Sequence, residues 1–260
     1  MNAIDLRGLR TATFTSKDLS NIGEKIFFNE TSRKIEKLIF WNSKEKFPSF
    51  GIAHFVWLPK DYKQSIPLGD VFSEFLTFCD EHKISLPAWL QSNRTCPWTC
   101  PEEFEETKTK DSEMIESVRD FLNTQKSIQA AFVVEKFVKA LPAVIDKMRE
   151  EDKDQAAEYC NILLNDQRGC FALIDYSSFK GFGLGEGSPA YNHQNWGLRQ
   201  VIERVLAKDW RDNCLEFFIE SAKETLANRI TNAPIEQQPI EQSYILGWNN
   251  RLDRYRLEQF

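Results

Sequence analysis

The sequence has few of the residues that build metal and cofactor sites. Only three histidines occur in 260 residues, and they are far apart in the chain, at His54, His82 and His193. The one close pair of cysteines, Cys96 and Cys100, lacks the spacing of a zinc knuckle and has no histidine near it. We therefore expect neither a metal site nor a cofactor.

The cysteines are also too few to specify a disulfide framework. Six cysteines in a chain of this length are more typical of scattered core thiols than of a disulfide-linked scaffold. The proline-containing segment between Cys96 and Cys100 would permit a local bridge. Closing such a short loop removes little entropy from the unfolded chain, so a bridge there would stabilise the fold only slightly.

An excess of positive charge and a long apolar run are missing as well. The net charge of -6 and the pI near 5.3 argue against a nucleic-acid partner or an anionic membrane surface. No uncharged apolar stretch is long enough to cross a bilayer, so we expect no transmembrane helix. The first residues, MNAIDLRGLRTATFTSKD, contain no apolar stretch of signal-peptide length. We expect either a cytoplasmic protein or a periplasmic or exported one whose signal peptide has been removed.

Aromatic residues, by contrast, are abundant. The chain has 20 Phe and 7 Trp, and such rings either build cores or line grooves that bind the apolar faces of sugars. The length, with 42% hydrophobic and 28% charged residues, fits a single globular domain over residues 1–260.

Hydrophobic spacing predicts an α+β fold that is mostly α, with one small N-terminal β-hairpin and about eight helices. Apolar residues at helical spacing predict a first helix that runs to about Glu30. Ser16 and Ser20 precede this pattern, and either could cap the helix.

The hairpin is predicted at 37–58, from two β-like runs at 37–41 and 49–58 that a polar loop joins. The segment 85–110 is rich in Pro, Trp and charge and predicts a long loop. The helix after it at 128–137 should kink or end at Pro142. Helical spacing is found at 68–78, 114–122, 128–137, 153–165, 171–179, 195–208, 213–230 and 243–257.

Glu30 is the first candidate for catalysis. It lies three residues after Phe27 and four after Ile26, so on a helix it projects from the apolar face that packs inward. Desolvation and the negative end of a helix both favour the protonated carboxyl, as a general acid working near neutral pH requires. The alternative is that the helix ends by Asn29 and Glu30 points into water.

The stretch NETSRKIEKLIFWNSKEKFPSFGIAHFVW, in which Glu30 is the first glutamate, resembles the phage-type lysozymes and endolysins. In those enzymes a catalytic glutamate ends a helix and precedes a hairpin with a T-x-G-x-G-H strand. ALIDYSSF, WGLRQVIERVL and GWNNRLDRY in the C-terminal third are also similar to that group. The chain most resembles an uncharacterised bacterial family of the lysozyme-like superfamily with a W-N-x-G-E-x-F-x-S-x-G-I-G-H-F stretch. The similarity is discontinuous, and 65–165 has no clear phage-lysozyme counterpart.

The resemblance implies a lysozyme-like fold, with peptidoglycan as the substrate and Glu30 as the general acid. It also implies that the Ser49 hydroxyl holds the attacking water and that His54 closes the strand. Two positions depart from the pattern, because Asn42 stands where the phage type has a second carboxylate and Ala53 replaces the second glycine. An asparagine cannot act as a base at ordinary pH, so Asn42 is expected only to contact the substrate.

Glu45, in the hairpin loop, could supply the missing carboxylate, since an inverting glycosidase needs two carboxyls roughly 6.5–9.5 Å apart. The alternative is a solvated loop charge. Trp41 and Trp57 could stack on sugars or fill the hairpin core. His54 fits a structural hydrogen bond better than proton transfer.

The segment 179–197 carries five of the 11 glycines and lies between two predicted helices. No strand precedes it and no Gly-Lys-Ser/Thr follows, so we expect a tight backbone path beside a binding groove instead of a nucleotide loop. Glu186 is a third candidate acid. Tyr191, Gln194 and Trp196 could contact ligand, although Trp196 could instead begin the core of the next helix.

These features predict a muramidase-like glycoside hydrolase or lytic enzyme with a polysaccharide substrate. Asn42 favours an alternative, a catalytically inactive lysozyme-like protein that binds glycan or a protein partner. A cytosolic interaction protein would also fit the acidic net charge.

Overall fold

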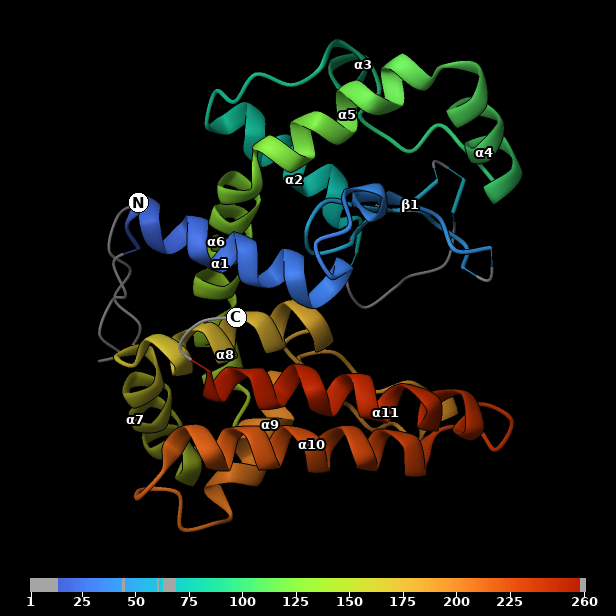
Figure 1. Cartoon of the computed structure of the whole chain (residues 1–260). Coiled ribbons are helices and arrows are strands. Elements are labelled where there is room, and N and C mark those ends of the chain that lie inside the picture. The colour runs from blue at the N-terminus through green and yellow to red at the C-terminus, as the bar shows by residue number, and fades with distance from the viewer. Residues whose placement is uncertain (1–13, 44, 60, 63–68, 258–260) are drawn as a thin grey trace. The chain divides into compact units, whose positions relative to one another are not determined.

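A computed structural model describes residues 14–43, 45–59, 61–62 and 69–257 of the chain. It is 67% helical, and the described residues form eleven α-helices and one three-stranded antiparallel sheet (Figure 1). The predicted class, α+β and mostly α, is confirmed, whereas the predicted number of about eight helices is wrong. The chain divides into two compact units, an N-terminal unit within 14–133 and a C-terminal unit that begins at Val134. The single domain over residues 1–260 stays a prediction.

The first helix, α1 (Ser16–Thr31), begins at a capping box formed by Thr15 and Asp18. The Thr15 hydroxyl accepts a hydrogen bond from the Asp18 N–H at 3.2 Å, and the Asp18 carboxylate accepts one from the Thr15 N–H at 2.8 Å. Both predicted caps, Ser16 and Ser20, are therefore wrong. They lie inside the helix, because a threonine one residue earlier already satisfies its free N–H groups.

The sheet contains, in spatial order, β1 (Ile39–Phe40), β2 (Ser49–Phe50) and β3 (Phe55–Val56), preceded by the 3₁₀ helix η1 (Ile35–Leu38). The prediction of a two-stranded hairpin is wrong, because the run 49–58 forms two strands separated by a turn at 51–54. Gly51 takes a φ of +78° and its N–H bonds to the carbonyl of Leu38 at 2.8 Å. That conformation turns the chain instead of extending it.

The further helices described in the N-terminal unit are α2 (Val71–Glu81), α3 (Ala88–Ser92), α4 (Pro101–Lys110), α5 (Ser112–Thr124) and the start of α6 (Lys126–Asp146). The prediction of a long loop at 85–110 is wrong, because α3 and α4 lie within it. Pro101 is the first residue of α4, where a missing backbone N–H costs nothing. Glu102 and Glu103 follow in the first turn, where negative charge favours the helix.

Aromatic rings fill the core of the N-terminal unit. Trp57 is fully buried, with its ring centroid 5.1 Å from that of Phe50, 5.0 Å from Phe72 and 5.9 Å from Trp98. The Trp98 indole N–H donates to the Thr107 hydroxyl on α4 at 2.8 Å. Trp98, in the segment predicted as a loop, therefore anchors that segment to the core.

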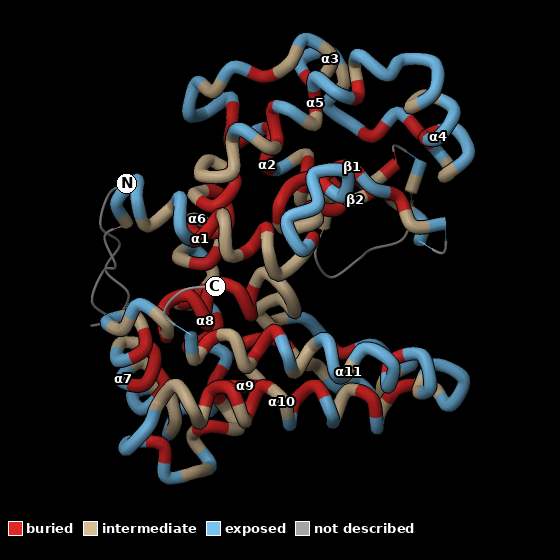
Figure 2. The backbone as a smooth tube through the Cα atoms, in the orientation of Figure 1, coloured by how far each residue is buried: buried red, intermediate tan, exposed pale blue. Residues whose placement is uncertain are grey.

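The C-terminal unit contains the remainder of α6, then α7 (Lys153–Leu164), α8 (Gln167–Lys180), α9 (Leu198–Leu206), α10 (Cys214–Asn232) and α11 (Gln238–Asp253). In this unit α10 packs against α9 and α11, and α7 against α8. The α6 helix passes Pro142 and ends one turn later, at Asp146. Helix α8 is buried from Gly169 to Ser177 (Figure 2). None of the described helices is long and apolar enough to span a membrane.

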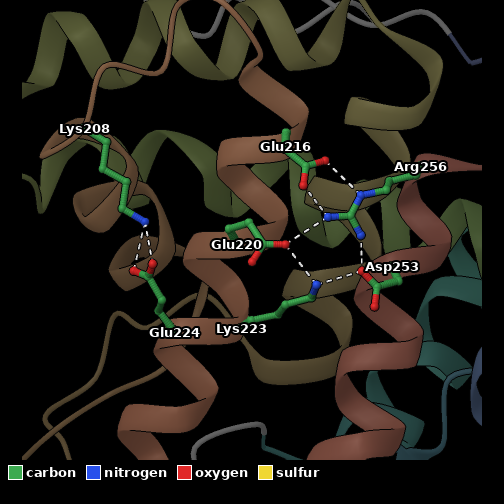
Figure 3. A network of polar contacts seen from close by, with 7 residues as sticks. All are labelled: Lys208, Glu216, Glu220, Lys223, Glu224, Asp253 and Arg256. Carbon is green, nitrogen blue, oxygen red and sulfur yellow. Dashed lines mark hydrogen bonds and ion pairs between the residues drawn. The ribbon is translucent and has the colours of Figure 1, made fainter.

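A polar network on α10 connects this helix to the end of α11 (Figure 3). Arg256 binds Glu216 and Asp253, and donates to Glu220 at 2.9 Å. Lys223 lies 2.9 Å from the carboxylate of Glu220 and 2.8 Å from that of Asp253. Alternating charges therefore hold the end of α11 against α10.

Candidate functional site

Glu30 is the penultimate residue of α1, which runs past Asn29 to Thr31. The helix ends where Ser32 takes the left-handed conformation and its N–H bonds to the Phe28 carbonyl at 2.9 Å. The Glu30 side chain is only 15% exposed, so the alternative in which Glu30 points freely into water is wrong.

His54 lies beside Glu30. The His54 Nδ1 atom is 3.7 Å from Glu30 Oε2, and the His54 side chain is 29% exposed. This separation is longer than a direct hydrogen bond but short enough for electrostatic coupling. The structure therefore brings together the predicted general acid and the histidine that was expected to close the strand.

Unusual backbone conformations gather around this pair. Ser32, Arg33 and His54 are non-glycine residues with φ of 56°, 61° and 48°. Three more such residues are Lys83, after the end of α2, and Asn192 and His193, in the glycine-rich loop of the C-terminal unit. Ser32 has this conformation as the cap of α1, whereas for His54 it is a costly conformation that surrounding contacts must maintain.

The three strands place Ser49 on the outer face of the sheet. Ser49 pairs directly with Phe40 on β1 and with Val56 on β3, and residues paired in this way share a face. Phe40 is 44% exposed and Ser49 is half-buried, whereas the other face, with Phe50, belongs to the core. Ser49 therefore lies on the face opposite Phe50, between the exposed Phe40 and the buried Val56.

Asn42 and Glu45 lie in the loop between β1 and β2, at the end of the sheet away from the turn that carries His54. The Glu45 N–H bonds to the Asn42 carbonyl at 2.8 Å, and the Trp41 indole N–H donates to the Glu45 carbonyl at 3.0 Å. Each paired segment is two residues long, about 7 Å, so this loop and the turn are separated by little more than one strand length.

Burial of its carboxyl raises the pKa of Glu45, although the residue as a whole remains exposed. A raised pKa suits a proton donor better than a base that must be ionised. Trp41, directly after β1, and Trp57, directly after β3, have little surface to offer a sugar, because Trp41 is 5% exposed and Trp57 is fully buried. Their placement favours the core alternative for both.

Glu186 lines a shallow cavity of about 380 Å³ in the C-terminal unit. Lys147, Arg199, His193 and Asn195 line it as well, so the cavity presents charges of both signs. The Arg199 guanidinium is held by hydrogen bonds to the carbonyls of Gly183 and Lys147, at 3.0 and 3.4 Å. Gln194 is exposed in the same loop and is not among the residues that line the cavity.

Tyr191 is engaged elsewhere in the C-terminal unit. Its hydroxyl donates to Glu241 at 2.6 Å, and Arg229 donates two hydrogen bonds to the same carboxylate, at 2.8 and 2.7 Å. The guanidinium carbon of Arg229 lies 4.1 Å from the centroid of the Trp196 ring, so Trp196 packs in this cluster. Burial works against the charge on Glu241, but the bonds from Arg229 and Tyr191 outweigh it and lower the pKa of Glu241.

The glycines of the loop allow the tight backbone path that the sequence predicts. A Cβ on Gly197 would lie 2.2 Å from the backbone nitrogen of Gly183, and Gly183 takes a φ of +71°. A larger residue at position 197 would displace the backbone of Gly183, and a Cβ on Gly183 would lie 2.0 Å from the side-chain oxygen of Gln200.

Within the described ranges, no group of three or more His, Cys, Asp or Glu side chains comes together in a way that could hold a metal ion. Cys96 and Cys100, both within the described ranges, are free thiols. Burial raises the pKa of Cys96 to about 12, which makes this thiol unreactive.

The predicted site residues thus divide between the two units. Glu30, Asn42, Glu45, Ser49 and His54 belong to the N-terminal unit, whereas Glu186, Tyr191 and Gln194 belong to the C-terminal unit. No protein-family model, curated protein or solved structure matches the chain.

Proposed function

We propose that this chain is a lysozyme-like glycoside hydrolase that cleaves the glycan strands of peptidoglycan, with Glu30 as its general acid. The observation that carries the proposal is the placement of Glu30, 15% exposed at the end of α1 and 3.7 Å from His54. A partly buried carboxyl beside the side chain of His54, in the turn between β2 and β3, suits proton transfer to a bound substrate.

Glu30 would donate its proton to the glycosidic oxygen as the bond between that oxygen and the sugar carbon breaks. The departing glycan leaves with the proton, and Glu30 is left as a carboxylate. The Nδ1 atom of His54, 3.7 Å from Glu30 Oε2, would face this carboxylate after the transfer.

The second half of the reaction needs a water molecule. The Ser49 hydroxyl can orient one on the outer face of the sheet, as the resemblance to phage-type lysozymes implies. Asn42 cannot deprotonate that water, and Glu45 is the carboxyl in the loop between β1 and β2. Because the transition state has oxocarbenium character, a positioned water with weak base assistance is a workable nucleophile.

Asn42 supports a second candidate function. A lysozyme-like chain without a second carboxylate could keep the glycan-binding surface and lose turnover. Such a protein would bind glycan, or a protein partner, at the Glu30 site without cleaving it.

Purified sacculi distinguish the two candidates. The enzyme should clear a sacculus suspension and release muropeptides that mass spectrometry detects, and Glu30→Gln should abolish the release. Glu36→Gln, an exposed glutamate on η1, is the matched control and should behave as the wild type. Binding to sacculi without any muropeptide release would support the inactive binder, and release by Glu30→Gln would remove Glu30 from the mechanism.

A further inference from the structure

Gln129, in the first turn of α6, is fully buried, and its side-chain amide makes three hydrogen bonds. Its Oε1 atom accepts from the Ile52 N–H at 2.9 Å. Its Nε2 atom donates to the carbonyls of Leu122 and Gln125, at 2.6 and 3.2 Å. Only this orientation of the amide makes all three bonds. In the flipped amide the NH₂ group would face the Ile52 N–H and the oxygen would face the two carbonyls.

The partners of Gln129 belong to two separate parts of the N-terminal unit. Leu122 and Gln125 lie at the C-terminal end of α5, where carbonyls have no partner within their own helix. Ile52 lies in the turn between β2 and β3, 77 residues from Gln129 in sequence. The buried amide therefore connects the junction of α5 and α6 to that turn.

Gly51 shows how closely the turn approaches this amide. A Cβ built on Gly51 would lie 2.3 Å from Gln129 Oε1, and the residue already holds a φ of +78°. Position 51 thus requires glycine both for its conformation and for the contact with Gln129.

His54 is the last residue of the same turn. Its N–H bonds to the Gly51 carbonyl at 3.3 Å, and its own φ is 48°, a conformation that surrounding contacts must maintain. We propose that Gln129 is a positioning residue, which holds the turn 51–54 in place and thereby sets the separation of His54 from Glu30. The effect of this positioning on catalysis rests on the proposed function. The positioning itself rests only on the contacts of Gln129 and Gly51.

Gln129→Met tests the role, because methionine has a similar length and no hydrogen-bonding amide. Tyr159→Phe is the matched control, since it removes one buried bond, from the Tyr159 hydroxyl to the Cys214 carbonyl at 2.9 Å, in the C-terminal unit. The first readout is hydrogen exchange at the Ile52 amide. Exchange should become faster by more than about tenfold in Gln129→Met and stay unchanged in Tyr159→Phe.

The second readout is the coupling between Glu30 and His54. The chain has only three histidines, so the ring signals of His54 can be followed by NMR as the pH is changed. In the wild-type background, Glu30→Gln should lower the pH midpoint of the His54 titration, because a neighbouring negative charge is removed. In the Gln129→Met background the same substitution should change the midpoint much less. An equal change in both backgrounds would overturn the proposal.

Gln129→Glu provides a rescue and covers the case in which Gln129→Met fails to fold. A protonated glutamate can accept from the Ile52 N–H with one oxygen and donate to the Leu122 carbonyl with the other. Protection of the Ile52 amide should therefore be close to wild type at low pH and fall as the carboxyl ionises. Protection that is independent of pH would contradict the role.

Failure of the positioning and failure of the proposed function give different results. If Glu30→Gln changes the pH midpoint of His54 much less in the Gln129→Met background and the wild type releases no muropeptides, the positioning stands and the hydrolase proposal fails. If the wild type is active and Gln129→Met retains both its kcat and the coupling, the hydrolase proposal stands and the positioning fails.

Discussion

The Oε2 atom of Glu30 lies 3.7 Å from the Nδ1 atom of His54, although the two residues come from a helix end and a turn between strands. Both side chains are less than one-third exposed, so each senses the charge of the other with limited screening by water. Substitutions at and around this pair test whether it is a catalytic centre.

Glu30→Gln should separate activity from stability. The amide keeps the shape of the side chain and removes the transferable proton, so turnover should fall by at least about 100-fold. The free energy of unfolding should change by no more than about 0.5 kcal/mol, or rise slightly, because a partly buried charge is removed. Thermal melting and muropeptide release by the same preparations check both halves, and a protein that no longer folds would make Glu30 a structural residue instead.

Asn42→Asp should increase turnover if the site lacks only its second carboxylate. A positioned general base contributes about 10²- to 10⁴-fold, so the gain in turnover should not exceed about 10⁴-fold. Initial rates of sacculus clearance for the wild type and Asn42→Asp measure it. Glu45→Gln is the comparison, because a loss of rate in that variant would show that Glu45 already supplies the base.

Asp175→Asn should destabilise the C-terminal unit strongly. Asp175 is fully buried, accepts two hydrogen bonds from Arg251 at 2.8 Å and accepts one from the Tyr255 hydroxyl at 2.6 Å. Removing one partner of a buried ion pair costs about 3–5 kcal/mol, because the other charge stays desolvated. Chemical denaturation measures the loss. Glu158→Gln, which removes an exposed pair with Arg211, should cost less than about 1 kcal/mol.

The network on α10 should contribute stability at neutral pH and lose it in acid. Hydrogen bonds from Arg256 hold the pKa of Glu216 below its ordinary value of 4.5. A depressed folded-state pKa means that the stabilisation is present above pH 4.5 and is lost as the pH falls through the lower, folded-state value. Glu216 is 40% exposed, so the effect should stay within about 1 kcal/mol.

Melting temperatures of the wild type and Glu216→Gln between neutral pH and acid check this dependence. The difference between the two should shrink below pH 4.5. Glu236→Gln, an exposed residue in the same unit, is the control. A difference that grows in acid would contradict the network's assigned role.

The thiols should fall into two classes of reactivity. Burial raises the pKa of Cys79, Cys96 and Cys160 to about 12, so each should react with a thiol reagent near neutral pH only after unfolding. Cys100 is half-buried and should react in the native protein. Mass spectrometry of labelled peptides measures each site. Cys96→Ser should lower the melting temperature little, because no local bridge is lost, and a large drop would contradict this.

Much of the fold could be predicted from the sequence, because the apolar residues of a single helix repeat with the helical period. The apolar spacing before Glu30 predicts a helix that reaches it, and α1 ends at Thr31. The helix predicted at 153–165 is found at Lys153–Leu164 for the same reason. Each pattern repeats with the helical period, so it can be recognised without knowledge of the partner surface.

Only the tertiary structure decided the details on which the site depends. The sequence pattern at 49–58 predicts one strand. In the structure a turn that begins at Gly51, close to Gln129, divides this run into β2 and β3. His54 lies near Glu30, and Ile52 bonds to Gln129. Each pair joins residues from different elements, so no repeating pattern in the sequence relates them. Periodicity reports which side of an element is buried, whereas the contacts of a single buried amide or carboxylate depend on how distant segments pack.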